Sequence, residues 1–424
     1  MMPTNRAADE PAVKDVVVPV PVPAPAELGT HVALLTGCQD RHYAFGLAMA
    51  LSFQGVAVDV IGSDNIDSPE LHSTPNVRFL NFRGTQSERA SFVEKLWKLA
   101  VYYGKLLAYA AVSRPKVFHI LWNNRIDWFD RTILMLYYKM VGKKVVLTAH
   151  NVNQARRDSK DSWLNRTTLK IQYRLCDHIF VHTQKMKSEL CRDFGVAEEL
   201  VTVFPYPVNN AFPETDLTSS QAKRRLGLEE NDKAILFFGR IVPYKGIEYL
   251  LDAFRLLLTG SGAKYRLIIA GEPKKGAEEY LRTIEESVEK NFHERQVTLK
   301  MEFIPDDEME VYFKAGDVLA LPYKEIFQSG ILFLAYSFGL PVVATDVGSF
   351  REEIVDGSMG FLCQPGDPEE LAKAIERYFA SELYMNLAAR RPRIREHANS
   401  THSWAAVAQL TWGAYAKVLT ENRS

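Results

Sequence analysis

The sequence predicts an α/β protein with two domains, each built on a parallel sheet that helices cover on both faces. Short apolar runs of four to seven residues alternate with longer amphipathic segments along nearly the whole chain, as in repeated βαβ units. A Pro/Asn cluster at 205–210 interrupts this pattern and marks a domain boundary. A chain of 424 residues with 47% hydrophobic and 24% charged residues suits two domains of about 150 to 200 residues.

The apolar runs are rich in Val, Ile, Leu and Phe and are predicted to be buried strands. In the first half they cover 31–37, 56–62, 77–82, 117–122, 145–150, 178–182 and 201–204. In the second half they cover 234–239, 266–271, 297–303, 318–322, 341–346 and 361–363. Helices are predicted at 246–257 and 331–338 and from about residue 370 to the end, where 404–419 has the apolar spacing of a helix that packs on a surface.

Composition narrows the classes of function. The net charge of −1 and the pI near 6.8 do not indicate a nucleic-acid partner, and none is expected. The four cysteines form no CxxC pair and no metal-ligand spacing, so we expect no disulfide, no bound metal and a reducing cytoplasm. The N-terminal apolar stretch 16–26 contains four prolines, which predicts a disordered tail over 1–28 rather than a signal peptide.

One uncharged stretch, 326–345, has the length of a membrane span. We expect it to be part of the second domain, because polar residues and helix breakers divide it into a loop, a helix and a strand. These residues are Gln328, Ser329, Gly330, Gly339 and Pro341.

The segment 237–246 contains the first candidate site. A predicted strand ends at Gly239, and Arg240 and Lys245 follow on a loop that opens a helix. Loops after the strands of a parallel sheet lie at the edge where ligands bind. The forked guanidinium of an arginine and the compact charge of a lysine both suit a diphosphate, although a solvated pair on a surface loop would have the same sequence.

The second candidate site is 321–330, LPYKEIFQSG, which precedes a predicted helix. Ser329 and Gly330 fall where this helix begins, and the free backbone N–H groups at a helix start favour an anion. Glu325 lies in the preceding loop, where a carboxylate could accept hydrogen bonds from sugar hydroxyls. The alternative is a plain strand-loop-helix unit with a solvated Glu.

Together the two segments resemble the C-terminal half of the family 4 glycosyltransferases, which have the GT-B fold. The resemblance rests on the GR(x4)KG loop, the acidic loop and helix ending in GLPVVAT at 339–345, and GSFRE at 348–352. It covers roughly residues 200–380 and extends more weakly over 30–200. It implies an acceptor domain at 29–208 and a nucleotide-sugar domain at 209–398 that face each other across a cleft, with a C-terminal helix at 399–424 returning to the first domain.

By this resemblance, Arg240 and Lys245 contact the nucleotide diphosphate and Glu325 contacts the transferred sugar. The rest of the donor site would consist of Gly239, Phe327, Gln328, Ser329 and Gly330. The resemblance also implies retention of the anomeric configuration, with the leaving phosphate helping to deprotonate the acceptor. No cofactor beyond the nucleotide-sugar substrate is expected, and metal independence is predicted because the sequence offers no persuasive DxD loop.

One position departs from the family pattern. The family usually places a second Glu eight residues after the first, on the helix, where it binds ribose hydroxyls. Here that position is Phe333, and counting back from Gly339 gives Leu334 instead. Neither residue is acidic, so the mode of ribose binding and the nucleotide preference stay open.

The predicted strand 145–150 ends at His150, on the expected cleft edge. The same family commonly has a His after this strand that reaches the donor sugar, although a lone His is otherwise more often structural. His119, inside an apolar run, is predicted to be a core or rim residue. Gly37, Asp40 and Arg41 follow the first strand and are expected to line the acceptor side.

Charge is unevenly distributed along the chain. Residues 91–174 hold 16 Lys and Arg against 5 Asp and Glu, interleaved with aromatic residues such as Trp97, Trp122 and Trp128. Such a surface suits peripheral contact with an anionic membrane. The equally weighted alternative is that the aromatic residues belong to the core and the charges to a solvated face.

The sequence therefore predicts a retaining, metal-independent hexosyltransferase that uses a nucleotide-diphosphate sugar. Its acceptor would be a saccharide or a lipid-linked saccharide, and its location cytoplasmic, at the inner face of the membrane if the acceptor is lipid-linked. The alternative is a non-catalytic GT-B subunit that binds a nucleotide sugar or a partner enzyme. A nucleotide-sugar epimerase or a phosphorylase on the same fold is a third interpretation.

Overall fold

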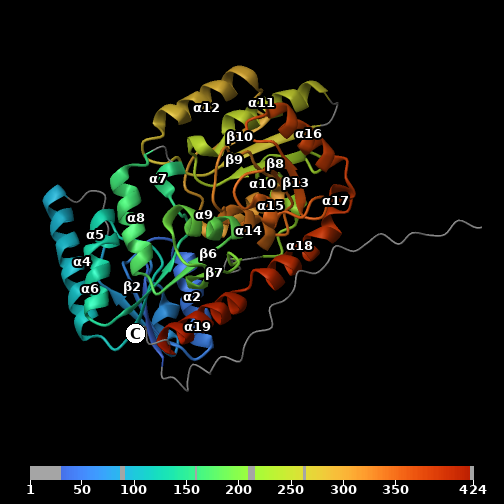
Figure 1. Ribbon diagram of the computed structural model, residues 1–424. Coiled ribbons are helices and arrows are strands. Elements are labelled where there is room, and N and C mark those ends of the chain that lie inside the picture. The colour runs from blue at the N-terminus through green and yellow to red at the C-terminus, as the bar shows by residue number, and fades with distance from the viewer. Residues whose placement is uncertain (1–29, 86–90, 158–159, 209–214, 261–263, 421–424) are drawn as a thin grey trace, which may run out of the picture.

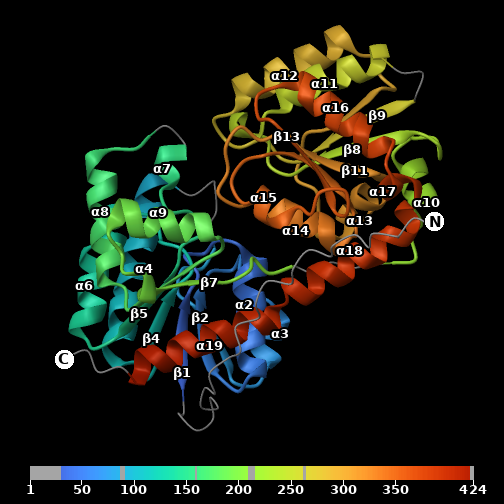
Figure 2. The same ribbon diagram turned by 45° about the vertical axis from the view of Figure 1, so that its right-hand side comes forward.

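The computed structural model describes residues 30–85, 91–157, 160–208, 215–260 and 264–420. The predicted tail at 1–28 lies outside the described residues. Two α/β units make up the molecule, and Figures 1 and 2 show helices on both faces of each sheet. The long helices α18 (Leu387–Thr401) and α19 (Trp404–Thr420) run from the second unit back across the first, as Figure 2 shows.

The first domain contains a sheet of seven parallel strands in the order β3-β2-β1-β4-β5-β6-β7. The strands are β1 His31–Leu35, β2 Ala57–Gly62, β3 Val77–Asn81, β4 Val117–Ile120, β5 Lys144–Thr148, β6 His178–Val181 and β7 Val201–Val203. Its helices are α2 Arg41–Phe53, α3 Pro69–Ser73, α4 Phe92–Val112, α5 Asp127–Arg131, α6 Ile133–Met140, α7 Gln154–Arg157, α8 Trp163–Leu175 and α9 Gln184–Phe194, with the 3-10 turn η1 Glu198–Leu200.

The second domain contains a sheet of six parallel strands in the order β10-β9-β8-β11-β12-β13. The strands are β8 Lys233–Phe238, β9 Tyr265–Ala270, β10 Val297–Lys300, β11 Val318–Leu321, β12 Val342–Thr345 and β13 Gly360–Cys363. Its helices are α10 Ser219–Arg225, α11 Ile247–Gly260, α12 Glu278–Asn291, α13 Asp306–Ala315, α14 Gly330–Ser337, α15 Phe350–Glu353, α16 Pro368–Phe379 and α17 Glu382–Met385, with the 3-10 turn η2 Pro243–Lys245.

The predicted fold class is confirmed, and each predicted strand overlaps an observed one. In both sheets the chain order reverses beside the first strand of the domain, between β1 and β4 and between β8 and β11. The loops after these strands diverge and leave a crevice at the carboxyl edge of the sheet, where α/β domains bind ligands. The stretch 326–345 divides into loop, α14 and β12, and none of the helices in the described ranges has the length and apolarity of a membrane span.

The C-terminal helix is an integral part of the first domain. In α19, Val407, Trp412 and Tyr415 are buried against α2 and the first sheet. The Tyr415 hydroxyl lies 2.6 Å from Nδ1 of His119, whose Nε2 lies 2.7 Å from the Thr148 hydroxyl. His119 is fully buried, so it is a core residue.

The two places where the chain passes between the domains meet at His402. Its Nδ1 donates to the carbonyl of Tyr206 at 2.9 Å, and its own carbonyl accepts from the Val208 N–H at 2.9 Å. Its Nε2 lies 3.2 Å from the Glu353 carboxylate of the second domain. These contacts tie the 205–208 linker to the break between α18 and α19.

Candidate functional site

Lys245, at the end of the loop after β8, is buried with only 6% of its surface exposed. Its Nζ lies 5.3 Å from the ring centre of Tyr323 and 5.7 Å from that of Phe237. Burial, with a smaller contribution from the neighbouring charge of Arg240, lowers the pKa of this amine to about 7. Arg240 itself is exposed at the carboxyl edge of the sheet.

Two glycines allow this loop to pack so closely. Gly239 has φ +107°, and a Cβ there would lie 3.1 Å from the Lys245 Nζ and 3.2 Å from the Ile331 side chain. Gly246 has φ +65°, and a Cβ there would lie 2.2 Å from the carbonyl oxygen of Pro322. Side chains at these positions would be strained and would displace the neighbouring loop.

The loop after β11 is bound to the loop after β8 through the backbone. The Lys324 N–H donates to the Tyr244 carbonyl at 2.8 Å. Ile331 is the second residue of α14, so the Lys245 amine and the start of this helix both lie against Gly239. The two sequence-predicted motifs therefore converge, and their cation and helix N-terminus share one edge of the sheet.

The loop after β12 completes this edge. Gly348 has φ +59°, and a Cβ there would lie 2.3 Å from the carbonyl oxygen of Ile326. Within the described part of the chain, the buried hydroxyl of Ser349 and both amide atoms of Gln328 have no hydrogen-bond partner. Buried polar atoms are normally paired, so these loops hold unused capacity for a polar ligand.

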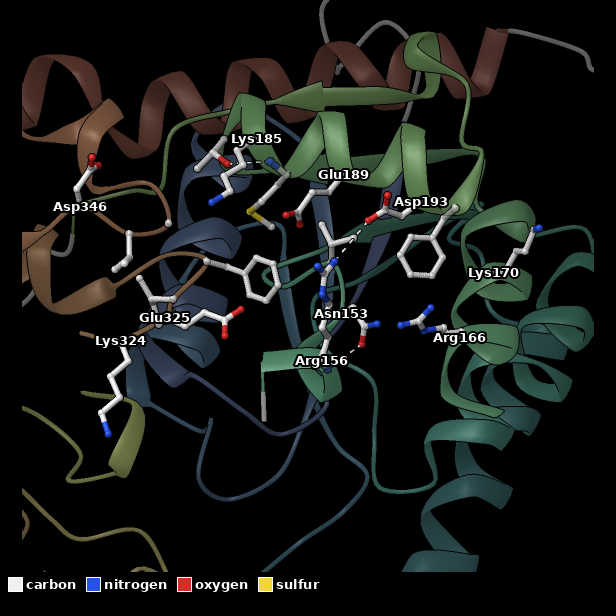
Figure 3. Close-up of a pocket in the computed structure, with 18 of the residues that line it drawn as sticks. Asn153, Arg156, Arg166, Lys170, Lys185, Glu189, Asp193, Lys324, Glu325 and Asp346 are labelled. Carbon is white, nitrogen blue, oxygen red and sulfur yellow. Dashed lines mark hydrogen bonds and ion pairs between the residues drawn. The ribbon is translucent and has the colours of Figure 1, made fainter. Parts of the chain in front are cut away.

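A cavity of about 910 Å³ separates the two domains, and Figure 3 shows the side chains that line it. Glu325 and Phe327 of the second domain lie on one side, and Phe327 also packs against the core of the first domain. The carboxylate of Glu325 points into the space, toward the guanidinium of Arg156 on α7 (Figure 3).

The first-domain wall of this cavity carries charges that the sequence analysis did not single out. Arg156, Arg166, Lys170 and Lys185 lie there together with Glu189 and Asp193. Arg156 lies 3.7 Å from Asp193, and Arg166 lies 2.6 Å from Asp161. The sequence did contain a sign of this basic wall, because basic residues recur every four positions along α8 and residues at that spacing share one face of a helix.

His150 lies in a group of aromatic rings rather than on the wall of the 910 Å³ cavity. Its ring stacks on Trp122 at 4.3 Å and 7°, and it meets the edge of Tyr43 at 4.7 Å. Nδ1 is 3.0 Å from His182 Nε2, and Nε2 has no partner among the described residues. Burial lowers the His150 pKa well below its ordinary value, so the ring is neutral near pH 7.

A smaller pocket of about 160 Å³ lies beside His150 and adjoins the larger cavity at Val152. Its lining is rich in amide side chains, among them Gln39, Asn123 and Gln172. The amides of Asn123 and Gln172 bond each other reciprocally, at 2.7 and 3.3 Å.

The three residues expected on the acceptor side differ in their surroundings. Gly37 has φ +56°, and a Cβ there would lie 2.7 Å from the carbonyl oxygens of Trp122 and Asn123. Asp40 caps α2 by accepting from the Tyr43 N–H at 3.1 Å. Arg41 is exposed at the start of that helix.

Phe333, at the position where the family usually has its second Glu, is buried with 1% of its surface exposed. Its ring stacks on Tyr206 of the linker at 5.3 Å and lies 4.7 Å from the ring of His402. The alternative position, Leu334, is 7% exposed. Both side chains contribute to the apolar core of the second domain. Across the described ranges, no group of three His, Cys, Asp or Glu residues could hold a metal ion.

Two family models match the chain. The model described as "Glycosyl transferases group 1" covers residues 219–399, and "Glycosyltransferase Family 4" covers residues 41–212. Among curated relatives, a D-inositol 3-phosphate glycosyltransferase of Corynebacterium diphtheriae is 27% identical over 398 residues, which is 88% of each chain. A mannosylfructose-phosphate synthase of Agrobacterium fabrum is 28% identical over 246 residues, or 56% of this chain and 52% of the relative.

Solved structures share the fold. The sucrose-phosphate synthase of Thermosynechococcus elongatus matches with a TM-score of 0.73 and 19% identity, over 92% of this chain and 99% of that one. Anabaena HepE, solved in complex with UDP-glucose, matches with a TM-score of 0.70 and 17% identity, over 92% and 99%. With two parallel-sheet domains and glycosyltransferase models matching both, this chain belongs to the family 4 glycosyltransferases of the GT-B fold.

Proposed function

We propose that the protein moves a hexosyl group from a nucleotide-diphosphate sugar to a hydroxyl of a saccharide or lipid-linked acceptor. The observation that carries this proposal is the buried side-chain amine of Lys245 beside the start of α14. No carboxylate of the described residues forms an ion pair with it. A buried cation without a counter-ion is costly, and a diphosphate would provide the missing negative charge.

This arrangement suits the chemical step. Breaking the bond between the sugar and the diphosphate leaves a phosphate dianion, and positive charge fixed where that anion develops lowers the barrier. Lys245, Arg240 and the backbone N–H groups at Gly330 would supply it. Glu325, which points into the interdomain cavity, would orient the sugar.

Relatives support the choice of donor. HepE has been solved with UDP-glucose and with UDP. A UDP-sugar is therefore the first donor to test, with GDP- and ADP-sugars beside it because the sequence leaves the nucleotide preference open. The neutral His150, next to an amide-lined pocket, would contact the bound sugars as a hydrogen-bonding group rather than as an acid.

We further propose that transfer retains the anomeric configuration, as the family resemblance implies. We also propose that it needs no metal ion, because the fixed cations and the helix start would stabilise the negative charge on the leaving diphosphate. Proton NMR of the first product formed would report its anomeric configuration. Activity unchanged by EDTA would agree with metal independence, and restoration by Mg²⁺ or Mn²⁺ after chelation would contradict it.

The central test is Lys245→Ala, with Lys264→Ala as the matched control because Lys264 is exposed and paired with Glu229 outside the site. We expect Lys245→Ala to remove most nucleotide release and most sugar transfer, and Lys264→Ala to remove neither. If donor hydrolysis and transfer both survive Lys245→Ala within about threefold, the diphosphate assignment is wrong.

One observation favours a second candidate, a non-catalytic subunit that binds a nucleotide sugar or a partner enzyme. It is that both candidate positions for the second Glu of the family pattern, Phe333 and Leu334, hold buried apolar side chains. Calorimetric titration with nucleotide sugars followed by an assay of nucleotide release separates the two. Binding without release, with saccharide and lipid-linked acceptors present, would favour the subunit.

We also propose a cytoplasmic location, at the inner face of the membrane when the acceptor is lipid-linked. The basic and aromatic character of residues 91–174 supports it. Fractionation of cells that express the tagged protein would test the location, and recovery from the periplasm or the medium would contradict it.

A further inference from the structure

Exposed apolar side chains gather on one part of the first domain. Seventeen large apolar side chains are exposed within the described ranges, and eleven of them belong to α4, α5, α6 and α8. They include three tryptophans, Trp97, Trp128 and Trp163, which are 69%, 52% and 78% exposed. A soluble monomer rarely leaves so many large apolar groups together in water, so this surface is expected to have an occupant.

The N-terminal end of α4 is the most pronounced part of this surface. All seven residues from 91 to 97 are exposed, and Phe92 and Val93 are 81% and 75% exposed. Figure 1 shows this end of α4 at the outer edge of the first domain. Phe92 and Leu96 lie on the same side of the helix as the buried Tyr103. The core-facing side of α4 therefore continues for about two turns beyond the layer it covers.

The outer face of α6 adds a second stripe. Ile133, Leu136 and Met140 recur at positions i, i+3 and i+7, and they are 50%, 47% and 83% exposed. This spacing puts all three on one side of the helix. The helices are neighbours, because the Tyr137 hydroxyl of α6 donates to the Leu107 carbonyl of α4 at 3.0 Å.

Charge favours an anionic lipid surface over a protein partner. The span 91–174 holds 16 basic residues against five acidic ones, and of its nine lysines Lys95, Lys105, Lys116, Lys160 and Lys170 are exposed, whereas Lys143 is buried. Lysine is depleted in protein–protein interfaces. Lysine stems and tryptophan rings, by contrast, suit the boundary between headgroups and acyl chains, where anionic headgroups attract the positive charge.

The surface borders the proposed active site. Each of α4, α5 and α8 follows a strand, so each begins near the carboxyl edge of the first sheet, which is the edge that faces the cavity. Trp163, in the first turn of α8, also lines the interdomain cavity. A bilayer in contact with these helix ends would hold its headgroups beside the mouth of that cavity.

We propose that the ends of α4, α5 and α8 and the outer face of α6 dock on an anionic lipid bilayer. Phe92, Leu96 and Trp97 enter the interfacial region, and the surrounding lysines lie at the headgroups. The benefit for catalysis, access to a lipid-linked acceptor, rests on the proposed function. The docking itself is measured without donor or acceptor, so its failure and a failure of the transferase proposal are distinguishable.

The test uses flotation of the full chain with vesicles of phosphatidylcholine alone or mixed with phosphatidylglycerol. We expect binding to the mixed vesicles only, and release as the salt concentration rises. The double variant Phe92→Ser/Trp97→Ser should bind at least about tenfold more weakly. The matched control is Leu256→Ser/Met385→Ser, which removes exposed apolar side chains from the second domain and should bind like the original protein.

The folding of both double variants is checked first, and three results would then overturn the docking proposal. The changed side chains are exposed, so both double variants should keep the original thermal midpoint and circular dichroism spectrum, which shows that they are folded. Equal binding by the original protein and Phe92→Ser/Trp97→Ser overturns the proposal, as does absence of binding to the mixed vesicles. So does a dimer in solution that this variant converts to a monomer, because the surface would then cover a second copy of the chain.

Discussion

Lys245 is expected to make donor binding depend on pH. Burial lowers its pKa to about 7 from an ordinary 10.5. Below that pKa the amine is charged before the donor arrives, whereas above it the diphosphate binds only together with a proton. A nucleotide sugar should therefore bind about 10-fold more weakly at about pH 8, and about 100-fold more weakly at about pH 9, than at about pH 6.

Titration calorimetry with UDP-glucose measures both the affinity and the protons exchanged. Repeating the titration in buffers of different ionisation enthalpy should show uptake of about 0.9 proton per donor at about pH 8. In Lys245→Arg the side chain stays charged throughout this range, so the proton uptake and the pH dependence should disappear. Lys264→Ala, outside the site, should behave like the original protein.

A flat affinity between about pH 6 and about pH 9 would refute this reasoning. So would equal proton uptake by the original protein and Lys245→Arg, because the titrating group would then lie elsewhere. If the protein prefers a donor with another nucleotide base, the same titration applies to the GDP- or ADP-sugar that binds best.

The same pKa has a consequence for stability. Between about pH 7 and about pH 10.5 the unfolded chain holds a proton on Lys245 that the folded chain lacks, so stability should rise with pH across this window. The charged amine costs the folded state up to about 5 kcal/mol below pH 7. Lys245→Met should therefore raise the thermal midpoint most at about pH 6, and the gain should shrink toward about pH 10.

Three further predictions concern the surroundings of the site. Gly246→Ala should lower kcat/KM at least about tenfold, because its Cβ would push against the Pro322 carbonyl. The control is Gly276→Ala, where φ is also positive but the added Cβ would have no atom within 4 Å, so this variant should lose stability only. Phe333→Glu should lower the free energy of unfolding, measured in urea titrations, by about 3 kcal/mol, because its carboxylate would be buried beside Tyr206. It should not tighten donor binding, and Phe333→Leu should cost less stability. Tighter donor binding by Phe333→Glu would contradict the packing argument. The pH–rate profile should show no step near 6.5 from His150, whose pKa is well below that value, and a step there that disappears in His150→Gln would contradict its neutral state.

Much of the fold could be predicted because parallel strands buried on both faces leave continuous apolar runs in a sequence. The ends of the runs were less reliable. The run 297–303 was predicted to be one strand, but β10 ends at Lys300, and Phe303 is 65% exposed in the loop beyond it. An apolar residue in a loop cannot be told from the end of a strand by hydrophobicity alone.

The same distinction applies to the candidate site: features within one local motif could be predicted, and contacts between distant segments could not. The location of Lys245 and Gly330 at the carboxyl edge of the second sheet could be predicted because each lies within one local motif, a loop that follows a strand. The surroundings of His150 could not, because its ring neighbours Trp122, Tyr43 and Tyr206 come from three distant segments. The burial that lowers the Lys245 pKa was equally hidden, since it depends on Tyr323 of another loop.

Phe333 links the donor site to the contact between the domains. Its ring packs between Tyr206 of the linker and His402 at the break between α18 and α19, the two places where the chain passes between the domains. Gly330, where the donor phosphate would bind, lies one turn earlier on the same helix, and a Cβ there would lie 3.3 Å from the Tyr206 hydroxyl. Any shift of α14 on donor binding must therefore move the linker or lose this stacking. The packing of Phe333 thus couples α14 to the relative position of the domains.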